Sequence, residues 1–166
     1  MKSPLRIIDS VSEWSGKVFS LLLIVVVFII TYEVIARYAF GAPTKWAHEL
    51  MTMLSGVVYI IGGAYTLYTR GHVNVDVLHT RLSVRGRAIL DLVTFLFFLA
   101  FVGVILWSGG RQAWDSVMRW EVSRSHWAPP MWPIRLMVPL GAFLLLAQGL
   151  AKFIRDLSVA TTRVPQ

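Results

Sequence analysis

RGHVNVDVLHTRLSVRGR, residues 70–87, is the most polar stretch of a very apolar chain. It holds four of the sixteen Lys and Arg residues and two of the four histidines. Two long apolar runs lie on each side of it. This arrangement predicts two hydrophobic hairpins joined by one basic segment, which we call the hinge. The charge of the hinge should decide how the chain sits in a membrane, because Lys and Arg collect on the cytoplasmic side.

The composition is that of a membrane protein. Of the 166 residues, 56% are hydrophobic and 15% are charged, whereas soluble domains carry about 25% charged residues. The net charge of +7 is explained by basic flanks of membrane spans, so no nucleic-acid partner is expected. The absence of cysteine excludes disulfides, thiolate metal sites and thiol nucleophiles.

The fold predicted is an all-α integral membrane protein, a single domain over residues 1–166 with four transmembrane helices in two hairpins. A short amphipathic lead-in is expected over residues 4–17. The first span should remain uncleaved, because no small-residue cleavage site follows its apolar run. Gly71 is expected to end the second span as a C-terminal cap. The spans are expected at about residues 18–38, 46–68, 88–107 and 134–153.

Topology follows from the distribution of Lys and Arg. The two termini and the hinge share one side of the membrane and carry ten of them, whereas the other two connections carry six. The positive-inside rule therefore places both termini and the hinge in the cytoplasm. It places the Trp-rich and Pro-rich segment 108–133 in the periplasm. Gly109 and Gly110 leave open whether the third helix continues into this segment.

Glu33 and Arg37 are the first candidate site. Glu preceding Arg by four residues is the favourable order for an ion pair on a helix. Charges inside a membrane are costly and often mark ion or proton sites, which is one interpretation. Because this pair lies near the end of its span, we favour a neutralised structural pair or a contact to a partner subunit.

The histidines offer two further hypotheses. His72, Asp76 and His79 could share one helical face, and two His with a carboxylate are a known metal set. Gly71 and the alternating valines argue against one helix through His72, so a polar contact surface is favoured. A haem-binding anchor would need facing histidines inside the spans, and none lies at mid-membrane depth.

Three other features indicate protein contacts. The second span contains Gly56, Gly62 and Gly63, and small residues let helices approach closely in lipid. Gln148, deep in the fourth span, is expected to bond to a neighbouring helix. Five tryptophans cluster toward the outer side, and both an aromatic belt and a docking platform remain open. These are the tryptophans at positions 107, 114, 120, 127 and 132.

The order of several short motifs resembles the small membrane subunit of tripartite ATP-independent periplasmic (TRAP) transporters, the DctQ-like small permease. The resemblance covers roughly residues 15–155. The motifs are Glu33-x-x-x-Arg37-Tyr38, Pro43-x-x-Trp46-x-x-Glu49, Gly71-His72-Val73-x-Val75-Asp76, Trp127-Ala128-Pro129-Pro130-x-Trp132-Pro133 and Pro139-Leu140-Gly141.

The resemblance implies a three-component transporter in the bacterial inner membrane. A periplasmic binding protein captures an organic acid, and a large multi-span permease moves it by an elevator motion driven by a sodium gradient. The small subunit braces the static scaffold of that permease among membrane lipids, with no catalytic role, no cofactor and no substrate or ion ligands. The candidates for partner contacts are Glu33, Arg37, Trp46, Glu49, Gly56, Gly62, Gly63, Gly71, His72, Asp76, Trp127, Trp132, Pro133 and Gln148.

Two alternatives stay open from the residues alone. The chain could be a small stand-alone transporter that uses Glu33 as its ion site, or the membrane anchor of a redox enzyme. Neither a phosphate-binding loop nor a dense polar interior is present in the sequence, which favours a subunit over a self-sufficient transporter.

Overall fold

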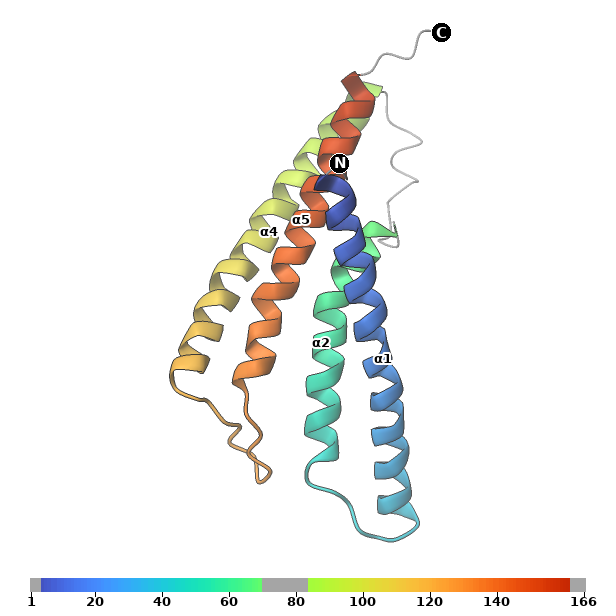
Figure 1. The fold of residues 1–166 in the computed structure, drawn as a ribbon, viewed down its shortest axis with the longest axis vertical. Helices are drawn as coiled ribbons and strands as arrows, with labels where there is room; N and C mark the ends of the chain where they lie inside the picture. Colours follow the sequence, from blue (N-terminus) through green and yellow to red (C-terminus); the bar gives the residue numbers. More distant parts are fainter. Residues whose placement is uncertain (1–3, 70–83, 162–166) are drawn as a thin grey trace.

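The computed structural model describes residues 4–69 and 84–161. These two ranges contain four helices, each long and apolar enough to cross a membrane. They form two antiparallel hairpins, α1 with α2 and α4 with α5 (Figure 1), so the predicted fold class is confirmed. Gly71, His72 and Asp76 lie outside the described residues. The helices are α1 (Pro4–Tyr38), α2 (Ala47–Tyr68), α4 (Val84–Met118) and α5 (Trp132–Thr161).

Three helices extend beyond the spans expected from hydropathy, α1 and α4 by more than α5. The amphipathic lead-in and the first span form the single helix α1, and α4 continues through Gly109 and Gly110 to Met118. Each has 35 residues, which is about 52 Å at 1.5 Å per residue and exceeds the roughly 30 Å of a hydrocarbon core. The non-helical part of the Trp-rich segment is therefore only residues 119–131.

The helices stand in a row and do not close into a symmetrical bundle. The main contacts join α1 to α2, α2 to α5, and α5 to α4, while α1 also touches α5. The helix order across the molecule is therefore α1, α2, α5, α4. We call the end at which α1 and α4 begin and α2 and α5 end the hinge end. The opposite end carries both hairpin connections and is the loop end (Figure 1).

Glycines bring neighbouring helices into close contact. A Cβ atom at Gly141 of α5 would lie 2.4 Å from Cγ2 of Ile60 in α2, and one at Gly16 of α1 would lie 2.4 Å from Cγ of Tyr65. Such distances leave no room for a larger residue, and close backbone approach is the usual basis of helix packing in lipid. These two glycines therefore hold α2 between α1 and α5.

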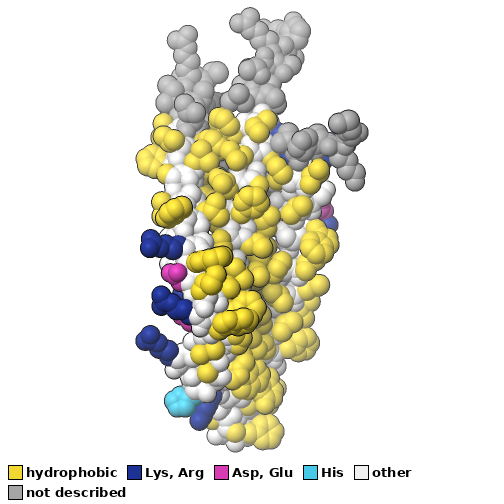
Figure 2. All heavy atoms as spheres, turned by 60° about the vertical axis from the view of Figure 1, so that its left-hand side comes forward, with side chains coloured by type: hydrophobic (Ala, Val, Ile, Leu, Met, Phe, Trp, Pro, Cys, Tyr) yellow, Lys and Arg dark blue, Asp and Glu magenta, His cyan; other side chains and the backbone are white. Residues whose placement is uncertain are grey.

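The core is small and the apolar surface is large. In the most apolar windows of the four helices, between 6% and 28% of residues are buried. Figure 2, in which the α4 side comes forward, shows hydrophobic side chains over most of the visible surface. It also shows Lys and Arg side chains gathered along one edge toward the loop end. A surface this apolar would drive association in water, whereas lipid or another membrane protein can cover it.

Candidate functional site

Glu33 organises the connection between α1 and α2. Its Oε1 accepts hydrogen bonds from Nε of Arg37 at 3.0 Å and from Nη2 at 2.5 Å, so the predicted ion pair is present. Its Oε2 accepts bonds from the backbone N–H of Thr44, at 3.1 Å, and from the Thr44 hydroxyl. The Thr44 hydroxyl in turn accepts a bond from the N–H of Ala47, at 3.4 Å. Both carboxylate oxygens are thus used by groups of the chain itself.

Glu49 ties the two hairpins together at the loop end. It lies in the first turn of α2, where the helix dipole favours an anion. Its Oε1 accepts a bond from the Ser123 hydroxyl, and its Oε2 accepts one from the Ser125 hydroxyl at 2.5 Å. Hydrogen bonds to an ionised carboxylate are among the stronger ones in proteins. The connection of the second hairpin is therefore held against the start of α2.

The connection 119–131 is an ordered hairpin. An isolated antiparallel bridge pairs Val122 with Pro130, and the N–H of Met131 donates to the carbonyl of Glu121 at 2.8 Å. Arg135 in the first turn of α5 forms an ion pair with Glu121 at 2.7 Å, and both side chains are about one-third exposed. These contacts hold the connection against the start of α5.

Aromatic rings add a second link at the loop end. Trp46 lies 5.9 Å from the ring of Tyr32 in α1 and 6.4 Å from the ring of Trp127 in the 119–131 connection, measured between ring centroids. Trp120 and Trp132 form an edge-to-face pair at 5.7 Å. We call Glu49, Ser123, Ser125, Trp46 and Trp127 the loop-end link, because these residues join the two hairpins.

A second set of polar contacts joins the hairpins at the hinge end. The side chain of Gln148 is buried, with only 2% of the residue exposed. Its Oε1 accepts a bond from the Ser12 hydroxyl at 3.2 Å, and its Nε2 donates to Oδ1 of Asp9 at 3.1 Å. The same Asp9 oxygen pairs with Nη2 of Arg155 at 2.6 Å. We call these four residues the hinge-end clamp.

The clamp confirms one prediction and corrects another. Gln148 does bond to a neighbouring helix, as its depth indicated. As a candidate contact to another protein it was misplaced, because its amide is buried and used within the chain. Its partners Asp9, Ser12 and Arg155 were missed. The opposite charges of Asp9 and Arg155 at the two ends of the chain were the visible indication that these ends might pair.

The glycines of α2 have a different environment from those that pack the helices. A Cβ atom at Gly56, Gly62 or Gly63 would meet no atom within 4 Å. The close contacts inside the chain instead use other glycines, namely Gly16, Gly109, Gly141 and Gly149. The predicted small-residue surface of α2 therefore faces outward from this chain.

The described residues hold no cluster of three His, Cys, Asp or Glu side chains that could bind a metal ion. Among the same residues, the polar or charged side chains buried in the molecule are Gln148 and three serines, at positions 12, 15 and 116. His48 lies in the first turn of α2 and His126 in the 119–131 connection. The polar contacts inside the chain thus concentrate at its two ends.

Four membrane-length helices with uncovered apolar surfaces define a multi-pass membrane protein. Residues 13–159 match the family model for the DctQ component of tripartite ATP-independent periplasmic transporters. The chain therefore belongs to the DctQ family, the small permease subunit of TRAP transporters, and the resemblance noted in the sequence is confirmed. A search of curated proteins found no match. The family is one of transporter components that act with a large permease and a binding protein.

Proposed function

We propose that this chain braces the static scaffold of a large TRAP permease in the bacterial inner membrane. The complete transporter imports an organic acid delivered by a periplasmic binding protein and is driven by a sodium gradient. The observation that carries the proposal is the placement of the polar contacts. They join the two hairpins at both ends, whereas the faces between them are apolar and largely uncovered. This arrangement suits a rigid support whose exposed apolar faces contact a partner subunit.

The face of α2 offers the best surface for the permease. Gly56 and Gly63 lie seven residues apart on one side of the helix, with Tyr59 between them and 75% exposed. Small residues at this spacing allow a second helix to approach closely, and Tyr59 supplies an aromatic ring to its surface. Gly62 extends the same open region. A helix of the permease scaffold packs here in the proposed complex.

The loop end is the surface proposed for the binding protein. It faces the periplasm in the proposed topology, which follows from the excess of Lys and Arg at the termini and hinge. Trp127 is 39% exposed and Trp120 72% exposed, and Arg124 lies between them in the chain. Tryptophan and arginine are the residues most enriched at binding hot spots. Trp132 and Pro133 lie at the start of α5, where the Trp132 ring contacts that of Trp120.

The alternative of a stand-alone transporter is less well supported. An ion site at Glu33 would need carboxylate oxygens free to bind a cation, but Arg37 and Thr44 donate to both. A haem anchor would need histidines facing each other within the spans. The described histidines, His48 and His126, lie instead at the loop end.

Co-purification with the permease tests the proposed surface. Gly56→Leu and Gly63→Leu should each sharply reduce recovery of the permease on the tagged small subunit, because leucine fills the open face. The matched control is Ser20→Leu, which adds the same side chain to an exposed position of α1. The helicity of every variant is measured by circular dichroism. Full recovery of the permease with both glycine variants would rule out this face of α2.

A further inference from the structure

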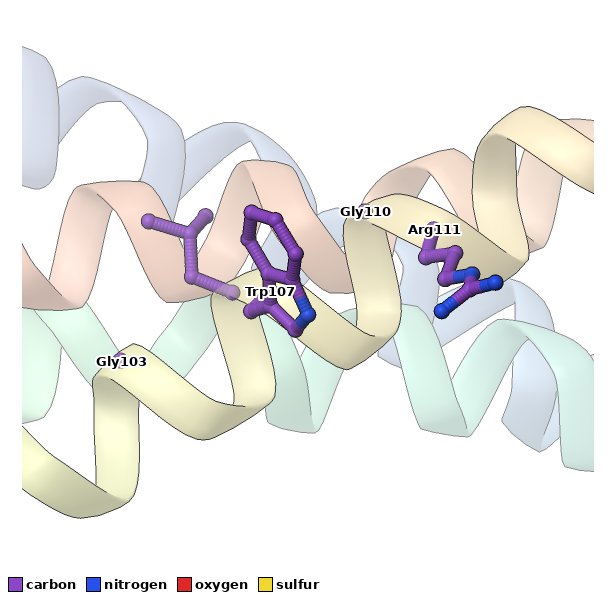
Figure 3. Close-up of a pocket in the computed structure, with 5 residues that line it drawn as sticks. Gly103, Trp107, Gly110 and Arg111 are labelled. Carbon is purple, nitrogen blue, oxygen red and sulfur yellow. The ribbon is translucent and has the colours of Figure 1, made fainter.

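A groove lies on the open side of α4, away from the face that packs on α5. Its floor is formed by Gly103 and Gly110, and a Cβ atom at either position would meet no atom within 4 Å. The groove has a volume of about 570 Å³ and is bordered by Leu106, Trp107 and Arg111 (Figure 3). It is therefore an open apolar groove along the helix, with one cationic side chain, that of Arg111, at one end.

The two large side chains of the groove project outward. Trp107 is 77% exposed. Arg111 makes no hydrogen bond or ion pair with any residue in the two described ranges, although Asp115 follows one turn later. Figure 3 shows Trp107 and Arg111 projecting from α4, with the guanidinium one turn farther along the helix than the indole. Both are available to a ligand.

In a membrane, the groove would extend from the headgroup boundary into the hydrocarbon core, as a bound phospholipid does. The 19 residues between Asp91 and Arg111 carry no charge. At 1.5 Å per residue they extend about 28 Å, close to the roughly 30 Å of a hydrocarbon core, which places Arg111 at the boundary between hydrocarbon and headgroups. Gly103 then lies about 12 Å deeper, at the level of the acyl chains. Tryptophans such as Trp107 favour this boundary.

We propose that this groove binds one anionic phospholipid. The guanidinium of Arg111 pairs with the lipid phosphate, since the planar fork of arginine matches two phosphate oxygens. One acyl chain lies along Gly103 and Gly110, between Leu106 and Trp107. The charge of the site selects this occupant over a helix of another protein, because an apolar helix would cover Arg111 and leave its charge without a counterpart. The proposal concerns this chain alone and does not depend on its permease.

Native mass spectrometry of the purified chain in detergent tests the proposal with two probes, phosphatidylglycerol and phosphatidylcholine. One phosphatidylglycerol should remain bound in preference to phosphatidylcholine. Arg111→Gln should weaken phosphatidylglycerol binding about tenfold and abolish the preference, because a charge-assisted contact is lost. Gly110→Leu fills the groove without changing the net charge, and it should also lower occupancy. Its fold should persist, since the added atoms enter open space.

The matched control is Arg119→Gln, which removes the same charge from an exposed position two turns beyond the groove. It should leave lipid occupancy unchanged. An equal loss with Arg119→Gln would show that any cation at this end attracts anionic lipid, and the site would not exist. Normal lipid binding by Gly110→Leu, combined with failure to co-purify with the permease, would assign the groove to a protein helix and overturn the proposal.

Discussion

Substitution of Gln148 by leucine should loosen the contact between the two hairpins. The change removes the hydrogen bonds from Ser12 and to Asp9 while keeping the side chain's bulk. Ser12 is only 1% exposed, so its hydroxyl would lose its acceptor, Oε1 of Gln148, without gaining water. Hydrogen bonds between membrane helices average about 0.6 kcal/mol each, and a buried polar group left unpaired costs about 1–3 kcal/mol. We expect the free energy of unfolding to fall by about 1–2 kcal/mol.

The assay is reversible unfolding of the purified chain in mixed micelles, followed by circular dichroism. A double-mutant cycle with Ser12→Ala isolates the bond to Ser12, and its coupling energy should be about 0.6 kcal/mol. Ser20→Ala is the control, because its hydroxyl bonds to Lys17 within the same helix and is exposed. Its effect should stay within about 0.5 kcal/mol. Unchanged stability of Gln148→Leu together with zero coupling would refute the clamp.

Three further predictions concern packing, the first connection and topology. Gly141→Ala should lower the free energy of unfolding by about 1–3 kcal/mol through overpacking against Ile60, whereas Gly62→Ala, in open space, should not destabilise the isolated chain; equal losses would contradict the packing. Glu33→Gln and Thr44→Val should each lower the thermal midpoint of unfolding. The two effects should be less than additive, because both substitutions break the same contact; fully additive effects would show that the two side chains act independently. Reporters fused to the C-terminus and inserted in the hinge should be active only in cytoplasm-sensing formats, and a periplasmic signal from either would reverse the proposed topology.

Hydropathy alone predicted the four helices and the two hairpins, because span length and polarity are local properties. It could not predict the clamp, since Asp9 and Gln148 are 139 residues apart and meet only because α1 touches α5. It also could not show where α4 ends, because Gly110 is compatible with both a helix and a break. The structure shows that α4 continues to Met118.

The choice of packing glycines illustrates the same limit. Gly62 and Gly63 form a conspicuous pair in the sequence, yet a Cβ atom at either would meet open space. Gly16 and Gly141 stand alone in the sequence but touch Tyr65 and Ile60. Which glycine is used depends on the rotation of each helix toward its neighbour, which composition does not encode.

The ion pair of Glu33 with Arg37 was predictable from spacing, because both residues lie on one helix. The contact of Glu33 with Thr44 was not predictable from spacing. Thr44 reaches Glu33 only because the connection folds back over the end of α1. Likewise, Ser123 and Ser125 meet Glu49 through the shape of the 119–131 hairpin, which brings a distant segment to the start of α2.

In the proposed function, this chain supports a transporter without itself moving a solute. Sodium-driven uptake of radiolabelled organic acids into proteoliposomes tests it most directly. Vesicles that contain this chain alone should show no uptake above empty vesicles, and vesicles with the permease, the small subunit and the binding protein should show it. Uptake by this chain alone, at a rate similar to that of the complete system, would contradict the account.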